Sequence, residues 1–157
     1  MADYYSGTLD DVKRVAKNIR VGEDVADDTN FAFTPAQAER FQAEADSVIN
    51  ARLRSIYLLP LRKVTLPGGV LDYPDPIPKI ARELAASLMA ISAYQESEPA
   101  FTESAKQMYE SADKTLNDLV AGLTRGTVDM QGQHPMARDA FIDPYTAPLG
   151  APPRPRT

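Results

Sequence analysis

The side chains that most often perform chemistry in proteins are scarce in this chain. It contains no cysteine and a single histidine, His134, which argues against thiolate catalysis, cysteine-ligated metal sites and Ser–His relays. His134 stands beside a proline without an orienting partner in the sequence, and we interpret it as a surface residue. Glu39 and Glu44 fit solvent-facing helix positions better than a glycosidase carboxylate pair. We therefore expect neither enzymatic activity nor a bound cofactor.

Two short segments could hold an ion, but both lack the residues that would complete such a site. The acidic segment contains Glu23, Asp24, Asp27 and Asp28, yet it has neither the order nor the central glycine of an EF-hand loop. A solvated acidic loop is the better interpretation. Pro67-Gly68-Gly69 lacks the spaced glycines and the Lys-Ser/Thr of a phosphate loop, and it indicates an ordinary turn.

A basic segment contrasts with this acidic one. Between Ser47 and Leu71 there is no acidic residue, and the segment carries Arg52, Arg54, Arg62 and Lys63. Opposite patches could join copies of the chain head to tail, or they could pair within one subunit. The basic residues could also face DNA phosphates, and a mixed surface without function is equally compatible. The net charge of −5 makes a general nucleic-acid coat or an anionic-membrane binder a poor candidate.

The elements that carry these residues are predicted to be helices. The 157 residues are 43% hydrophobic and 25% charged, which is typical of one globular domain, with or without a tail. No targeting or membrane-spanning segment is recognisable, so we expect a soluble intracellular protein. Thr8 is a candidate N-cap, and apolar residues recur at helical spacing from Leu9 to Ile19.

Prolines separate three further helices. The second should begin at Pro35 after the N-cap Thr34 and end near residues 57–59. Its predicted apolar stripe runs through Phe41, Ala45, Val48, Arg52 or Leu53, and Ile56. The third follows Asp75-Pro76, and because most of its faces are apolar or small we expect it to be central. The fourth should run from Pro99 to Arg125-Gly126, with an apolar stripe that starts at Phe101.

The last part of the chain has a different composition. Residues 127–157 lack helical periodicity and are rich in proline, yet they contain several large apolar side chains. We interpret them as an extended arm that docks on another surface, with a disordered tail as the alternative. The predicted fold is an all-α bundle of about four helices over residues 1–126, with a long C-terminal helix and this Pro-rich arm. No strand pattern is evident.

Several segments resemble head–tail connector proteins of tailed bacteriophages, the adaptor or neck proteins, including the Mu-like group. Tyr5–Val12 (YSGTLDDV) resembles their opening, and Ile49–Leu61 (INARLRSIYLLPL) is similar to their Arg-Tyr-x-x-Pro-Leu signature. Pro76–Ala85 (PIPKIARELA) matches a Pro-x-x-Ile-x-x-x-Leu-Ala helix. The last helix shares the positions Tyr109, Ala112, Leu116 and Gly126. The resemblance covers about residues 4–130 and excludes the acidic connection at 20–33 and the Pro-rich end.

The resemblance implies a structural protein without enzymatic activity, located at the virion neck and in the host cytoplasm during assembly. Such proteins form a homo-oligomeric ring, expected here to hold twelve subunits, beneath the portal protein. The ring extends the DNA channel, with non-specific DNA contact, and it docks a stopper or tail-completion protein. By analogy, the arm engages the portal or a neighbouring subunit. The candidate contact residues in the arm are Met136, Phe141, Ile142, Tyr145, Leu149, Arg154 and Arg156.

A different class of function also fits the composition. A small cytosolic helical module could bind a partner helix in an apolar groove and act as a regulatory or protein-binding domain. That hypothesis predicts a stable monomer or dimer with a dispensable tail.

Overall fold

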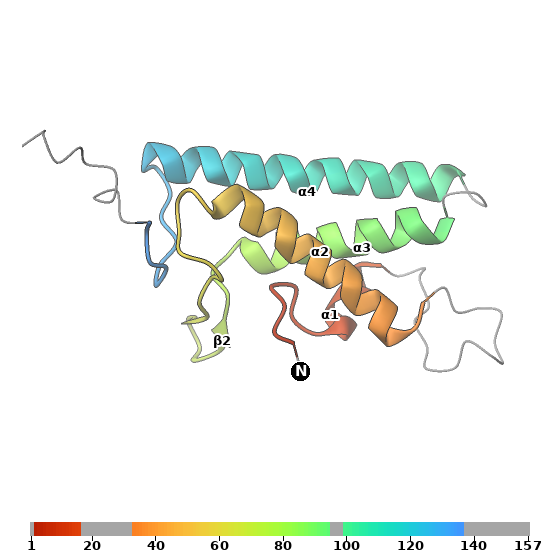
Figure 1. The fold of residues 1–157 in the computed structure, drawn as a ribbon, viewed down its shortest axis with the longest axis horizontal. Helices are drawn as coiled ribbons and strands as arrows, with labels where there is room; N and C mark the ends of the chain where they lie inside the picture. Colours follow the sequence, from red (N-terminus) through yellow and green to blue (C-terminus); the bar gives the residue numbers. More distant parts are fainter. Residues whose placement is uncertain (1, 17–32, 95–98, 137–157) are drawn as a thin grey trace, which may run out of the picture.

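The computed structural model describes residues 2–16, 33–94 and 99–136. It is a bundle of four helices, as predicted. They are α1 (Leu9–Val15), α2 (Pro35–Leu53), α3 (Ile77–Tyr94) and α4 (Pro99–Arg125), and a hairpin of β1 (Val64–Thr65) and β2 (Leu71–Asp72) lies between α2 and α3 in sequence. Helix α3 packs against the other three helices, and α4 runs along one side of the bundle (Figure 1).

Helices α1 and α2 begin where the sequence predicts. Each start is a capping box, in which two residues three positions apart exchange hydrogen bonds. In α1 the Thr8 hydroxyl accepts from the Asp11 N–H, and the Asp11 carboxylate accepts from the Thr8 N–H. Thr34 and Gln37 form the same arrangement at the start of α2. Pro35 occupies the first helical position of α2, where a missing N–H costs nothing. Local side-chain chemistry therefore fixes both starts.

Helix α2 ends earlier in the sequence than predicted. The helix stops at Leu53 rather than near residues 57–59. The Ile56 and Tyr57 N–H groups still bond back to the Leu53 carbonyl in a turn. The chain then pairs with a distant segment: the Leu58 N–H donates to the His134 carbonyl and the Met136 N–H donates to the Ile56 carbonyl, each at 2.8 Å. A pairing across almost eighty positions cannot be inferred from local spacing.

The buried face of α2 also differs from the predicted stripe. Its buried residues are Ala38, Gln42, Ala45, Ile49 and Leu53. Ala45 and Leu53 of the predicted stripe are buried, whereas Phe41 and Val48 are only partly buried. At those two points the buried face is turned by about one position, to Gln42 and Ile49. The polar residue Gln42 occupies the centre of this buried face, so a search for apolar periodicity does not find it.

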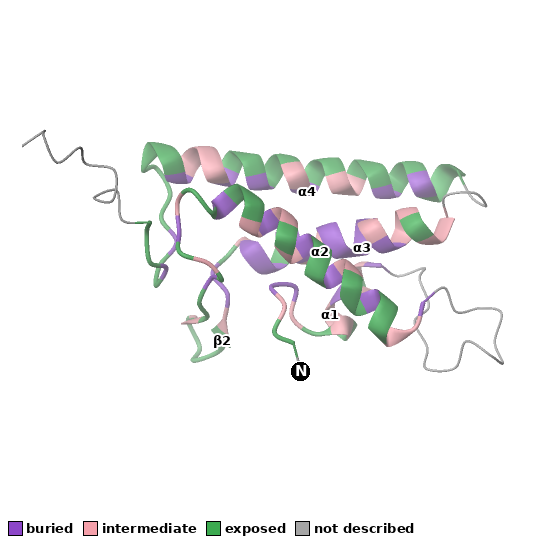
Figure 2. Cartoon of the chain, viewed as in Figure 1, coloured by how far each residue is buried: buried purple, intermediate pink, exposed green. Residues whose placement is uncertain are grey.

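The predictions for α3 and α4 hold with one exception. Half the residues of α3 are buried, which confirms it as the central helix, whereas α4 buries one edge and exposes a polar face (Figure 2). Gly126 ends α4 with a φ of 71°, the left-handed conformation that favours glycine. Phe101 was expected in the core but is 43% exposed, and Thr102 is buried in its place. The Phe101 ring lies 5.4 Å from that of Tyr94.

The expectation that no strands occur was wrong for residues 64–72. Val64 pairs with Asp72 and Thr65 with Leu71 in an antiparallel ladder. The turn contains Gly68 and Gly69, whose φ angles are 96° and 80°. Strands of two residues are too short to show a period-two pattern. Val70 and Leu71 project from this hairpin and are 60% and 63% exposed.

The first ten residues of the predicted arm pack on the bundle. Met130 is 2% exposed. The Gln133 side-chain amide bonds to both backbone groups of Arg62 at 2.7 Å. Gly132 has a φ of 74° and its Cα faces the Val64 side chain, where an added Cβ would overlap Val64 Cγ1. The remainder of the arm lies outside the described residues.

Candidate interaction site

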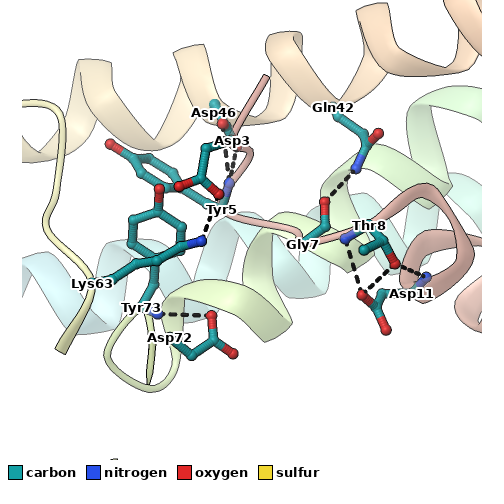
Figure 3. A network of polar contacts seen from close by, with 10 residues as sticks. All are labelled: Asp3, Tyr5, Gly7, Thr8, Asp11, Gln42, Asp46, Lys63, Asp72 and Tyr73. Carbon is teal, nitrogen blue, oxygen red and sulfur yellow. Dashed lines mark hydrogen bonds and ion pairs between the residues drawn. The ribbon is translucent and has the colours of Figure 1, made fainter. Parts of the chain in front are cut away.

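Tyr5 holds the N-terminal segment against two other parts of the fold. Its backbone N–H donates to both carboxylate oxygens of Asp46, at 3.2 and 3.1 Å. Its hydroxyl donates to Asn50 Oδ1 at 2.7 Å and accepts from the Leu61 N–H at 2.9 Å. Its ring meets that of Tyr73 edge to face at 4.8 Å. The segment is thereby fixed to α2 and to the loop before β1 (Figure 3).

An ion pair lies across this cluster. The Lys63 ammonium lies 2.7 Å from an Asp3 carboxylate oxygen and 5.4 Å from the centre of the Tyr73 ring. In Figure 3, Asp3, Tyr5, Lys63 and Tyr73 lie close together, with Asp46 of α2 beside them. Burial, followed by the charge of Asp3, raises the pKa of Tyr73 well above its ordinary value. A tyrosine is already uncharged at physiological pH, so this shift leaves the charge of Tyr73 there unchanged.

These residues border a pocket of about 450 Å³. Its walls are Asp3, Tyr5, Asp46, Asn50, Pro60, Leu61, Arg62, Lys63 and Tyr73. Asp46 is partly buried here, and burial together with the nearby Asp3 raises its pKa to about 6, although the Tyr5 N–H opposes that shift. No lysine or arginine of the described residues forms an ion pair with Asp46.

A second polar cluster anchors the following residues. The Gln42 amide donates to the Ser6 hydroxyl at 2.7 Å and to the Gly7 carbonyl at 3.2 Å, and Arg82 Nε donates to the Ser6 carbonyl at 3.0 Å. The hydrogen bond from the Thr8 hydroxyl is the main cause that lowers the pKa of Asp11. These contacts satisfy buried polar groups and give this cluster a structural role.

The four predicted basic residues do not act as one patch. Arg52 donates to Asn117 at 2.5 Å and pairs with Asp113 at 3.1 Å, which links α2 to α4. Lys63 is paired with Asp3. Arg54 and Arg62 are exposed and form no ion pair with another described residue.

A family model described as "Bacteriophage Mu, Gp36" matches residues 8–143. The chain belongs to this family. The match covers all four helices of this Gp36-family protein and the packed segment after α4. It confirms the resemblance to phage proteins noted in the sequence. No curated protein sequence matches the chain significantly.

Only some of the predicted interaction residues of this Gp36-family protein lie in the part of the chain that the structure describes. The acidic segment with Glu23, Asp24, Asp27 and Asp28 lies outside the described residues, so its pairing stays a prediction. Met136 is 38% exposed, near Leu58 at 55%, where the two segments hydrogen-bond. The other candidate arm residues are Phe141, Ile142, Tyr145, Leu149, Arg154 and Arg156, and all of them lie beyond the described part of the chain.

Sequence reasoning missed the central residues of the pocket. Asp46 lies among solvent-facing positions of α2, and only its contact with Tyr5, 41 positions away, distinguishes it. Tyr5 and Tyr73 are two of seven tyrosines in the chain, so composition alone does not single them out as anchors. Across residues 2–16, 33–94 and 99–136, no group of His, Cys, Asp or Glu side chains could hold a metal ion. Within those same ranges no helix is long and apolar enough to cross a membrane.

Proposed function

We propose that this Gp36-family protein is a virion structural protein, a head–tail adaptor that assembles as a ring beneath the portal. The expected ring holds twelve subunits, extends the DNA channel and docks a stopper or the tail. The observation that carries the proposal is the family match over residues 8–143. The connector-like segments noted in the sequence support it, since three of them form the junctions of the fold at the Tyr5 anchor, the end of α2 and the start of α3.

The shape of α4 suits assembly. Its 27 residues give a length of about 40 Å at ~1.5 Å per residue. Only one edge of it is buried in its own bundle, and the outer face is polar and of mixed charge (Figure 2). A long polar face of this kind can contact a neighbouring subunit through hydrogen bonds and ion pairs, as the rims of protein interfaces do.

Arg54 and Arg62 are the candidates for channel DNA. Both are exposed, and neither is paired with a described acidic residue, whereas Arg52 and Lys63 are committed to Asp113 and Asp3. A channel must let DNA slide, so these contacts should be few, independent of sequence and weakened by salt.

The arm is proposed to attach the ring to its neighbours. Residue 136 is held against the bundle by its hydrogen bond to Ile56, so the residues after it start from a fixed point. Phe141 and Tyr145 provide the apolar contact area. Replacing both with alanine is expected to weaken portal attachment while leaving the bundle folded, and unchanged attachment would contradict this part of the proposal.

Co-sedimentation with the candidate portal protein tests the proposed function. The adaptor hypothesis predicts that the full chain sediments with assembled portal at a fixed stoichiometry. A chain that stays monomeric or dimeric and never binds portal would overturn the hypothesis and favour a small helical binding module.

A further inference from the structure

Residues 61–64 form a linking strip between two segments that are far apart in the sequence. The first and third residues of the strip contact the segment before α1. The Leu61 N–H donates to the Tyr5 hydroxyl at 2.9 Å, and the Lys63 ammonium lies 2.7 Å from an Asp3 carboxylate oxygen (Figure 3). These two contacts tie the strip to residues that precede every helix of the bundle.

The second and fourth residues of the strip contact the chain that follows α4. This part of the chain, residues 130–136, is the root of the arm. The Gln133 side-chain amide accepts from the Arg62 N–H and donates to the Arg62 carbonyl, each at 2.7 Å. Gly132 lies so close to Val64 that a Cβ added to the glycine would overlap Val64 Cγ1. The strip therefore alternates, residue by residue, between the N-terminal segment and the root of the arm.

This alternation is the one expected of an extended chain that leads into β1. In such a chain the N–H and C=O of one residue point to one edge, and those of the next residue point to the opposite edge. The Leu61 N–H accordingly meets the Tyr5 hydroxyl, whereas both backbone groups of Arg62 meet the Gln133 amide. The strip thus lies between the two segments as a central strand lies between its neighbours.

Both edges of the strip are shielded from water. Tyr5 is 2% exposed and Gln133 is 9% exposed, so a backbone group that loses either partner is left without an acceptor or donor nearby. When one segment detaches, the strip is held from one edge only and can shift, which weakens the contacts on the other edge. The N-terminal segment is also bonded to Asp46, and the root is also bonded to Ile56. Loss of one edge is therefore expected to cause local opening rather than complete detachment.

We propose that the linking strip couples the N-terminal segment to the root of the arm, so that detaching either one loosens the other. The coupling is reciprocal, because one linkage free energy governs both directions. A partner that draws residues 130–136 away from the strip therefore also releases the segment around Tyr5. The inference goes beyond the proposed ring, since it concerns contacts within one subunit and its tests contain no portal protein.

Hydrogen exchange of the full chain, followed residue by residue by NMR, tests this coupling. Gln133→Met keeps an unbranched side chain of similar length but removes both hydrogen bonds to the strip. It should raise the exchange rate of the Tyr5 N–H by about three- to tenfold, the effect typical of residues in one network. That N–H bonds to Asp46 and not to Gln133, so its exchange reports movement of the N-terminal segment. An unchanged rate would overturn the inference.

Ser87→Ala is the matched control. The Ser87 hydroxyl is buried and donates to the Leu84 carbonyl within its own helix, α3. This variant also loses a buried hydrogen bond, but it should leave the exchange rate of the Tyr5 N–H as in the unchanged chain. An equal rise in the two variants would reflect a general loss of stability and would contradict the coupling.

The reverse direction is tested with Tyr5→Phe, which keeps the ring but removes the acceptor for the Leu61 N–H. It should raise the exchange rate of the Met136 N–H, which is bonded to the Ile56 carbonyl. Tyr4→Phe is the control and should leave that rate unchanged. A root that exchanges alike in both variants would show that the strip transmits nothing.

A double-mutant cycle measures the coupling in the unfolding equilibrium. Gln133→Met should raise the unfolding constant by a factor at least about threefold smaller in the Tyr5→Phe background than in the unchanged chain. Equal factors in the two backgrounds would mean that the edges act independently, which is the opposite of the inference. If Tyr5→Phe does not fold, Asp3→Asn takes its place, since it removes only the ion pair to Lys63.

Discussion

The hydroxyl of Tyr5 donates to Asn50 Oδ1 at 2.7 Å and thereby joins the N-terminal segment to the last turn of α2. The same oxygen accepts from the buried Leu61 N–H, so one phenol group connects three stretches of chain. The pocket and its acid, Asp46, both depend on this anchor.

Tyr5→Phe is expected to destabilise the protein by about 1–3 kcal/mol, because it leaves the buried Leu61 N–H without an acceptor while the ring packing is retained. Urea unfolding followed by circular dichroism measures this. Tyr4→Phe is the control, since Tyr4 is more exposed and its change should stay within about 0.5 kcal/mol. Equal effects of the two variants would mean that the Tyr5 hydroxyl is not an anchor.

Asp46 should make stability depend on pH. Its folded-state pKa of about 6 lies above the ~3.9 of an unfolded aspartate, so the folded state binds more protons between these values. The stabilisation is complete below about pH 4 and is lost as the pH rises through about 6. Since Asp46 is partly exposed and faces Asp3 and Lys63, solvent screening should limit the loss to about 1 kcal/mol.

Unfolding free energies at pH 4, 5, 6, 7 and 8 measure this dependence. Asp46→Asn should flatten the dependence of the unfolding free energy on pH over that range. At pH 8 this variant should be at least as stable as the unchanged protein. Glu44→Gln should keep the original slope. If the Asp46→Asn profile still falls between pH 4 and 6, another group is responsible.

The close approach of Gly132 to Val64 predicts a site where alanine is not tolerated. Gly132→Ala would place a Cβ against Val64 Cγ1 at a positive φ, whereas Gly68→Ala at a similar φ meets no atom within 4 Å. Gly132→Ala should therefore lower the free energy of unfolding by about 1–3 kcal/mol more than Gly68→Ala does. Thermal unfolding compares them, and Val64→Ala combined with Gly132→Ala should recover part of the loss. Equal melting temperatures for the two single variants would contradict the packing of residues 127–136 on the hairpin.

Reversing the two unpaired arginines tests the proposed DNA contact. Arg54→Glu with Arg62→Glu should lower DNA retention in assembled particles while leaving the fold intact, because neither side chain is part of a described ion pair. Lys106→Glu with Lys114→Glu makes the same charge change on the exposed face of α4 and should have little effect. A similar loss with both pairs would indicate a general charge effect, and failure of ring assembly would place Arg54 and Arg62 between subunits.

Local rules predicted most of the helical fold. Thr8, Thr34 and Pro35 specify helix starts through groups within three positions, and Gly126 ends α4 through its own backbone conformation. The small and apolar residues of α3 are enough to predict that it is the central helix. Each of these signals acts over one or two helical turns, so the sequence carries it directly.

The features that were missed depend on contacts between distant residues. Gln42 is buried only because Ser6 and Gly7 accept its hydrogen bonds. Beyond α2, Ile56 and Leu58 pair with residues 134–136, which no local spacing predicts. Asp46 becomes distinctive only when Tyr5 and the β1 loop surround it. Such residues look like ordinary surface positions until the chain is folded.

Imaging the neck of the assembled particle tests the central claim most directly. The account predicts a closed ring of this chain stacked on the portal, with twelve subunits. A neck in which the chain is absent, together with a purified protein that stays monomeric or dimeric beside its portal, would contradict it.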